Sequence, residues 1–225
     1  GIVIFAAVMT TYKWDFRKLS TEKYETNSYE INEYFDNVSI DIDTAEILFE
    51  KSDNDKCVVI CRETEKVKHF VEVKNETLKI GMIDTRVWYD HIGIFADSME
   101  VTIYLPNHEY DSFMIETDTG DINMCPVVAN GNIEIETDTG DLLIKNVIVK
   151  EEFNIITDTG DVQLENSDAM NFNIKTDTGD VEGTLLSEKI FITETDKGRV
   201  DVPKTDTGGN CTVITNTGDI KIQLS

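Results

Sequence analysis

Aspartate is the residue type whose spacing most suggests chemistry in this sequence. The pentapeptide Thr-Asp-Thr-Gly-Asp occurs four times, and each copy places one aspartate before its glycine and one directly after it. Carboxylate oxygens are the ligands that calcium prefers in proteins, so the repeated aspartates are the candidates for a cation site. They are Asp118, Asp138, Asp158 and Asp177 before the glycines, and Asp121, Asp141, Asp161 and Asp180 after them.

A structural role competes with cation binding for these aspartates. An aspartate directly after a glycine can accept a backbone N–H and stabilise the turn. Calcium-binding β-rolls also stack glycine and aspartate, but they use a shorter glycine-rich nonapeptide, from which this repeat departs. We therefore assign no metal site, and calcium stays open as a weak possibility.

Catalysis is the third use that carboxylates could have here. Polysaccharide-cleaving β-helix enzymes act through paired carboxylates or an arginine base. In this chain the aspartates recur in every copy, whereas a catalytic pair would be expected once. The three histidines are scattered and no Cys-x-x-Cys pair is present, so nothing supports zinc. We predict a non-enzyme without catalytic or cofactor-binding residues, with a polysaccharide-cleaving enzyme as the rival hypothesis.

The spacing of the repeat indicates how the chain must fold to position these aspartates. Counting two variant copies near the C-terminus, successive motif glycines are 20, 20, 19, 19 and 20 residues apart. This period is too short for a propeller blade or a helical pair and fits one coil of a β-solenoid. The glycines are predicted to form structural turns, and they are Gly120, Gly140, Gly160, Gly179, Gly198 and Gly218.

Alternation within each repeat indicates strands. In the first copy, Phe113, Ile115 and Thr117 alternate with polar residues, so they are expected to face inward. Inward threonines argue against a flat ice-binding surface. The alternation changes phase at the Gly-Asp step, which predicts a corner where glycine takes a positive φ. Stacked coils would then align one apolar column, formed by Phe113, Ile133, Phe153, Phe172 and Phe191.

The last repeats depart from the consensus. If the coils stack in chain order, Arg199 takes the place of an aspartate and should lie between Asp180 and Asp219. A further copy at residues 203–209 falls half a coil out of register. We interpret it as the same turn chemistry on the opposite side of one coil.

The first half of the chain is less regular. Residues 38–48 read as a degenerate coil, and strand-like runs follow at 57–61, 67–73, 78–83 and 101–105. A solenoid end needs a cap, because unpaired strand edges invite aggregation. We expect residues 15–112 to form irregular coils and a cap, continuous in one domain with a regular solenoid at 113–225. The aromatic and apolar residues predicted to fill the cap are Trp88, Tyr89, Ile92, Ile94 and Phe95.

The N-terminal residues bear on the location of the protein. Residues 2–9 are uninterrupted apolar sequence, and Tyr12 and Trp14 follow, which favours 1–14 as the remnant of a transmembrane anchor; the alternative is a buried first strand.

The four cysteines show no disulfide pattern and are expected to be buried free thiols, namely Cys57, Cys61, Cys125 and Cys211.

The formal net charge of −24 argues against nucleic acid as a partner. Such a surface would attract metal cations, cationic polymers or basic proteins, although it also fits a solvated surface that keeps the chain soluble.

The Thr-Asp-Thr-Gly-Asp coils, the run Met99–Pro106 before them and the closing segment Thr215–Leu224 together resemble the bacterial putative-adhesin family. The resemblance covers roughly residues 25–225. It implies an all-β, right-handed, single-stranded parallel β-helix with coils of about 20 residues, carried outside the cytoplasmic membrane behind an N-terminal helix. That family has no known function and brings no catalytic residues.

The resulting hypothesis is a non-catalytic extracytoplasmic scaffold or binding protein, anchored to the bacterial cytoplasmic membrane or the cell surface. Its partner would be an envelope polysaccharide or protein of unknown identity, and membrane contact would come only through the anchor. The alternative is an envelope-stress accessory protein that acts through membrane partners.

Overall fold

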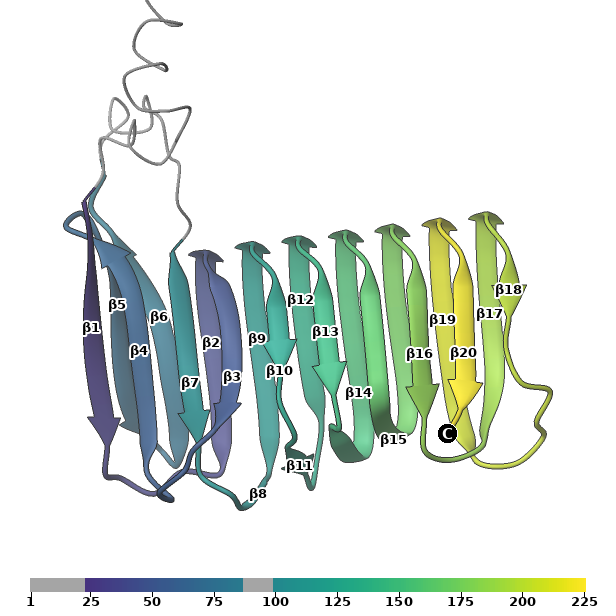
Figure 1. The fold of residues 1–225 in the computed structure, drawn as a ribbon, viewed down its shortest axis with the longest axis horizontal. Helices are drawn as coiled ribbons and strands as arrows, with labels where there is room; N and C mark the ends of the chain where they lie inside the picture. The colour runs from purple at the N-terminus through teal and green to yellow at the C-terminus, as the bar shows by residue number, and fades with distance from the viewer. Residues whose placement is uncertain (1–22, 87–98) are drawn as a thin grey trace, which may run out of the picture.

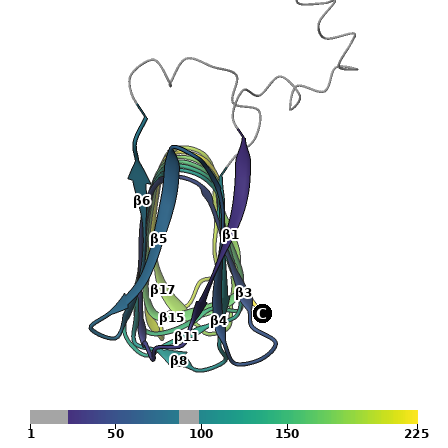
Figure 2. The same cartoon turned by 90° about the vertical axis from the view of Figure 1, so that its left-hand side faces the viewer.

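The computed structural model describes residues 23–86 and 99–225. Within these ranges the chain forms strands and turns and no helix, which confirms the all-β prediction. The strands build two long walls that face each other and are joined by turns along two edges, so the chain wraps around a narrow interior (Figures 1 and 2). This arrangement fits the predicted β-solenoid.

The walls are called here sheet A and sheet B. In order along sheet A, the strands are β1 (Tyr24–Ile31), β4 (Cys57–Thr64), β7 (Glu100–Leu105), β3 (Glu46–Lys51), β10 (Ile122–Met124), β13 (Leu142–Lys145), the first part of β15 (Val162–Thr178), β16 (Val181–Leu185), β20 (Ile220–Leu224) and β18 (Val200–Asp201).

Sheet B consists of β5 (Val67–Lys74), β6 (Thr77–Asp84), β2 (Asn37–Thr44), β9 (Ser112–Thr119), β12 (Ile133–Thr139), β14 (Ile148–Thr159), the second part of β15, β19 (Gly209–Thr217) and β17 (Lys189–Lys197). Two short strands, β8 (Glu109–Tyr110) and β11 (Val128–Ala129), pair along the lower edge, where β11 also meets the start of β14 (Figure 1).

The repeat period sets the strand register. Ile133 pairs with Phe113 on one side and Phe153 on the other, and Phe153 pairs with Phe172. These side chains are at most 1% exposed, as predicted for the apolar column. Burying a side chain of this size contributes roughly 1.5–3 kcal/mol, so the column is a main source of cohesion between coils. The inward threonines Thr117 and Thr137 are also buried, which confirms their predicted direction.

The glycine turns lie in successive layers along the upper edge. Gly160 has φ +157, and a Cβ placed on it would lie 1.9 Å from the carbonyl oxygen of Gly140. The amide of Gly160 donates to the carbonyl of Thr178 at 3.0 Å, which locks the turn to the coil on its other side. At Gly160, glycine is therefore required both by the predicted positive φ and by the close approach of stacked backbones, whereas at Gly140 and Gly198 the close approach alone requires it.

The order of the last coils differs from chain order, and our prediction of sequential stacking was wrong there. Strand β19 pairs with β15 on one side and β17 on the other, so the C-terminal pair β19 and β20 lies between earlier coils (Figure 1). Phe172 and Phe191 are consequently not neighbours, because Cys211 pairs with both. The repeats have almost the same length and register, so the periodicity does not determine which coil follows which.

In the first half of the chain the predicted coil and strand runs are confirmed, but the predicted parallel direction of all strands is wrong. The degenerate coil exists, since β2 pairs with β9 and Thr44 lies opposite Thr119. The predicted strand runs appear as β4, β5, β6 and β7. However, β1 and β4, β4 and β7, and β5 and β6 are antiparallel pairs, so the fold is not parallel throughout. These antiparallel strands form the N-terminal end of the stack (Figure 2).

The predicted cap residues Trp88, Tyr89, Ile92, Ile94 and Phe95 lie outside the described residues, as does the predicted anchor at 1–14. Within the described ranges, no helix is long and apolar enough to cross a membrane.

Candidate functional site

The aspartates before the glycines form one exposed row along the upper edge. Each lies between two threonines that pair with those of the adjacent coil, so Asp118, Asp138, Asp158 and Asp177 follow one another as predicted. The row continues beyond them, because Asp43 is level with Asp118 and Asn216 donates to Asp177 at 3.2 Å.

The aspartates after the glycines form a hydrogen-bonded ladder. The amide of Asp141 donates to the carboxylate of Asp121 at 2.9 Å, and Asp161 donates to Asp141 in the same way. Asp180 donates to Asp161 at 2.8 Å. Each carboxylate therefore accepts the backbone N–H of the next coil, which is the turn-stabilising role considered from the sequence, extended from one coil to its neighbour.

Arg199 ends this ladder, and the prediction that it lies between two aspartates was wrong. Asp219 donates to Asp180 at 2.7 Å, and Arg199 donates its amide to Asp219 at 2.8 Å. The guanidinium also binds Asp219, with Nε 3.1 Å from Oδ2. This charged hydrogen bond holds the pKa of Asp219 below its usual value. The inserted C-terminal coil is the reason for the changed order.

Neither row is arranged as a metal centre in the described residues, where no group of three or more His, Cys, Asp or Glu side chains could hold one ion. The two rows differ in what they offer a ligand. The ladder carboxylates accept backbone amides, whereas the aspartates before the glycines, called here the outer row, have exposed side chains.

A buried polar network lies at the N-terminal end, and the sequence reasoning missed it. The carboxylate of Glu63 accepts hydrogen bonds from the amide of His69 at 2.6 Å, from His69 Nδ1 at 3.0 Å and from Asn27 at 2.5 Å. Glu63 and His69 are 1% and 4% exposed. The burial of Glu63 could have been predicted from the alternation in this strand, since Cys57, Val59 and Cys61 place Glu63 on the inward side.

Burial and hydrogen bonding set the protonation of this pair. Burial alone would raise the pKa of Glu63, but the hydrogen bonds from His69 and Asn27 outweigh it and lower that pKa. Burial lowers the pKa of His69, and Glu63 offsets this only in part. His69 Nε2 is buried without a partner among the described residues. The arrangement fits an ionised Glu63 that accepts from a neutral His69.

An aromatic cluster on the lower edge was also missed. Tyr34 stacks against His108 with ring centroids 6.4 Å apart, and His108 packs on Tyr110 at 4.0 Å. The Tyr34 hydroxyl donates to Asp36 at 2.5 Å. These residues come from two turns that are distant in sequence, and neither turn has a spacing that would single it out.

The cysteines are free, and three are buried as expected: Cys57, Cys61 and Cys211. Cys125 departs from the prediction because it is only partly buried. Burial raises the pKa of the three buried thiols to about 12 and that of Cys125 to about 11. All four thiols therefore stay protonated at neutral pH and react slowly.

Comparison with known proteins finds one matching family model and several solved structures of similar fold. A family model described as Toastrack DUF4097 matches residues 35–225. No curated protein matches the sequence. Among solved structures, a putative cell adhesion protein from Clostridium sporogenes is 16% identical, with a TM-score of 0.51, covering 91% of this chain and all of that one.

Two further structures are similar at lower scores. A putative adhesin from Bacteroides fragilis is 14% identical, with a TM-score of 0.47 and coverage of 90% and 97%. A putative lipid binding protein from Parabacteroides distasonis is 13% identical, with a TM-score of 0.32 and coverage of 92% and 98%. Only the Clostridium protein has a TM-score above 0.5, and at 16% identity its similarity supports the fold alone. Since the family model spans most of the sequence, the chain belongs to the Toastrack DUF4097 family, a domain of unknown function.

Proposed function

We propose that this chain is a non-catalytic, extracytoplasmic, adhesin-like protein that presents a rigid acidic edge to a cationic group of an envelope polysaccharide or protein. In this proposal, residues 1–14 belong to an anchor in the bacterial membrane or cell surface. The regular part at 113–225 is a right-handed parallel β-helix with coils of about 20 residues, and the irregular N-terminal part, with its antiparallel end strands, continues it in one domain.

The observation that carries the proposal is the outer row of carboxylates. Backbone pairing holds its members in adjacent coils, about 4.8 Å apart, so their mutual repulsion cannot be relieved by moving the backbone. Two unit charges at that spacing repel by about 0.9 kcal/mol at the dielectric constant of water, and salt and splaying of the side chains reduce this repulsion. A bound cation or cationic partner would remove this cost and would bind with a strong salt dependence.

Binding to isolated envelope fractions tests the proposal. The purified chain is mixed with cell walls and membranes of the source organism, and bound protein is measured by co-sedimentation at several salt concentrations. We expect binding that weakens with salt and falls at least tenfold when four aspartates of the row become asparagine, namely Asp118, Asp138, Asp158 and Asp177.

The control removes the same charge from other exposed positions by changing four glutamates to glutamine: Glu134, Glu151, Glu152 and Glu182. If both variants lose binding equally, net charge and not the row is responsible, and the proposal is wrong. Incubation with a polysaccharide panel addresses the enzyme alternative, because released reducing or unsaturated ends would contradict a non-catalytic role.

Calcium binding by the row is proposed only as a weak, non-catalytic contribution. A modest rise in melting temperature with calcium, lost with the four-asparagine variant, would support it. An unchanged melting temperature with calcium and with chelator would remove it.

A further inference from the structure

The lower edge of the solenoid carries a ladder of aromatic rings that reaches from the core to solvent. Phe113 and Tyr110, both 1% exposed, have ring centroids 5.2 Å apart. Tyr110 lies 4.0 Å from His108, and His108 lies 6.4 Å from Tyr34, which is 67% exposed. The outermost ring is therefore supported from the interior while most of its surface is open.

The turn that carries Tyr34 is fixed by hydrogen bonds. It joins β1 to β2 along the lower edge (Figure 1). The amide of Asp36 donates to the carbonyl of Glu76 at 3.1 Å, and the amide of Asp111 donates to the carbonyl of Asp36 at 2.7 Å. The Asp36 carboxylate accepts the Tyr34 hydroxyl through Oδ2, and its Oδ1 lies 3.9 Å from His108 Nε2. One aromatic face and one carboxylate thus occupy fixed positions beside each other.

The surroundings of the ring are negatively charged. The hydrogen bond to Asp36 raises the pKa of the Tyr34 hydroxyl, and the nearby carboxylates of Asp36, Glu76 and Asp111 act in the same direction. The whole chain carries a formal charge of −24. An anionic ligand would be repelled from this site, whereas a cation would be attracted both by the carboxylates and by the aromatic face.

A concave surface adjoins the rings. His108 and Tyr110 also line a pocket of about 130 Å³. Its other walls include Lys51, Leu105, Cys125 and Val127. An aromatic face beside a small pocket with polar and apolar walls suits a ring-shaped ligand that has an apolar face and polar substituents, as a sugar has.

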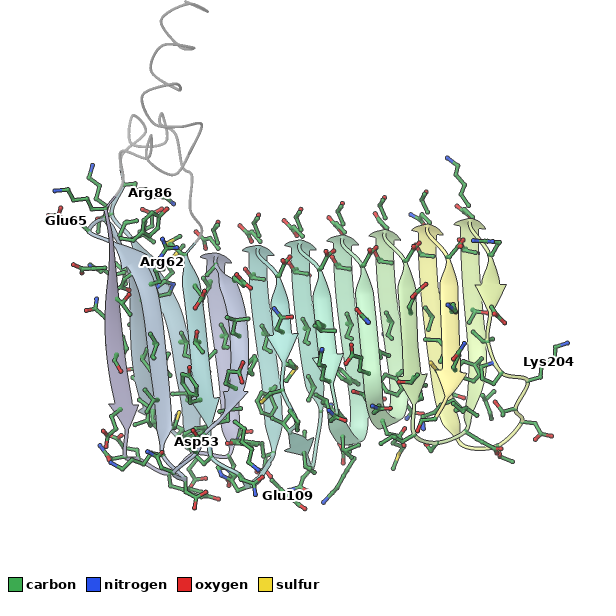
Figure 3. The ribbon with its side chains drawn as sticks, in the orientation of Figure 1. Asp53, Arg62, Glu65, Arg86, Glu109 and Lys204 are labelled. Atoms are coloured by element: carbon green, nitrogen blue, oxygen red, sulfur yellow. The ribbon has the colours of Figure 1, made fainter. Side chains whose placement is uncertain are left out.

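We propose that Tyr34, His108 and Asp36 form a binding site for an amino sugar with a free amine, such as a glucosamine unit of a partly deacetylated polysaccharide. The sugar ring stacks on Tyr34, and its ammonium group pairs with Asp36. The inference rests on the proposed function for the protein's position at the cell surface. The site itself lies on the lower edge, where β8 is seen in Figure 1 and Glu109 of β8 is labelled in Figure 3; the aspartate row is on the opposite edge, and the site does not require it.

Three hexasaccharides with the same β-1,4-linked backbone test the site, because they differ only at C2: glucosamine hexamer, N-acetylglucosamine hexamer and cellohexaose. Isothermal titration calorimetry is run at a pH where the amine is protonated. We expect the glucosamine hexamer to bind at least tenfold more tightly than the other two. Equal affinity for all three would contradict the role of the ammonium group.

Variants locate the binding. Tyr34→Ala should weaken binding of the glucosamine hexamer at least tenfold, Tyr34→Phe should retain it because the ring remains, and Asp36→Asn should weaken it severalfold. Tyr34 is largely exposed, so its variants should keep the wild-type melting temperature. Unchanged affinity in a folded Tyr34→Ala protein would overturn the proposal.

The four-asparagine variant of the aspartate row separates this inference from the proposed function. It should bind the glucosamine hexamer with wild-type affinity while losing envelope binding. If it loses the hexamer and Tyr34→Ala does not, the hexamer binds to the aspartate row, which overturns the lower-edge site and supports the upper one. If envelope binding is unaffected but the hexamer still requires Tyr34, only the proposed function fails.

Discussion

At the N-terminal end of the solenoid the outer strands run antiparallel to their neighbours, whereas at the C-terminal end β17 and β18 keep the parallel direction. The N-terminal end contains the polar network of Asn27, Glu63 and His69, and apolar side chains of β1 such as Tyr29 and Ile31 pack against the core there. The C-terminal interior ends on Phe191, which is only partly buried, and Ile192 on the outer face is 53% exposed.

The two ends show different ways to finish a repeat fold. In the polar network at the first end, Glu63 accepts from both His69 and Asn27, so these residues depend on one another. The C-terminal end relies instead on inserting the last strands between earlier ones, which leaves β20 paired with β16 and β18 and not at an edge. Stability should therefore depend on single residues at the first end and on strand order at the second.

The largest expected effect concerns strand order at the C-terminal end, because an engineered disulfide there either forms or does not. Lys175 pairs with Ile214, and Ile214 pairs with Glu194. In a Cys125→Ser background, Lys175→Cys with Ile214→Cys should form a disulfide, since neighbouring strands lie within the permitted Cα separation. Lys175→Cys with Glu194→Cys should not, as those residues are two strands apart. Non-reducing mass spectrometry distinguishes them, and the reverse result would contradict the inserted coil.

Loss of the Glu63 carboxylate gives the next largest effect. Glu63→Ala leaves the neutral donors of His69 and Asn27 without their acceptor, so the free energy of unfolding should fall by about 1–3 kcal/mol. Glu63→Gln keeps one acceptor oxygen and should lose less. The control is Glu182→Ala in β16, an exposed position expected to change stability by less than about 0.5 kcal/mol. Urea unfolding measures all three, and a loss below about 1 kcal/mol for Glu63→Ala would argue against the network.

The same network predicts a pH dependence. The pKa of His69 is lowered from 6.5, so between its folded and unfolded values the unfolded chain binds more protons. Its contribution is present above pH 6.5 and is lost as the pH falls through the folded pKa. Glu63, lowered from 4.5, acts in the same direction below that pH. Acid also reduces charge repulsion across this acidic chain, so the wild type is compared with His69→Gln in urea titrations.

We expect the stability of the wild type to fall more steeply than that of the variant as the pH drops from 7 to 5. Parallel curves would mean that His69 does not titrate differently in the folded and unfolded states.

The two aspartate rows give the smallest effects and a contrast between them. Asp141→Ala removes the acceptor for the Asp161 amide and should cost about 1 kcal/mol. Asp138→Ala removes an exposed charge next to like charges, so it should be neutral or slightly stabilising, more so at low salt. Thermal melts at two salt concentrations measure both. Equal losses would show that the rows do not differ as their hydrogen bonds indicate.

Much of the regular half was predictable because each local signal agreed with the others. The glycine spacing predicted the coil contacts, and the alternation around Phe153 and Thr157 predicted which side chains are buried. The ladder formed by Asp121 and Asp141 was predictable as a turn-stabilising interaction, but its partner in the next coil was not. The antiparallel strands at the N-terminal end carry the same alternation as parallel ones, so their direction was not predictable.

The sequence by itself determined the period, the inward and outward faces and the glycine corners of this protein, because these depend on residues within one coil and on their repetition. Tertiary structure decided the order of the last coils, the partners of Glu63 and the meeting of Tyr34 with His108. Those features join segments whose local patterns are equivalent or unremarkable, so only the packing of the whole chain selects among the possible pairings.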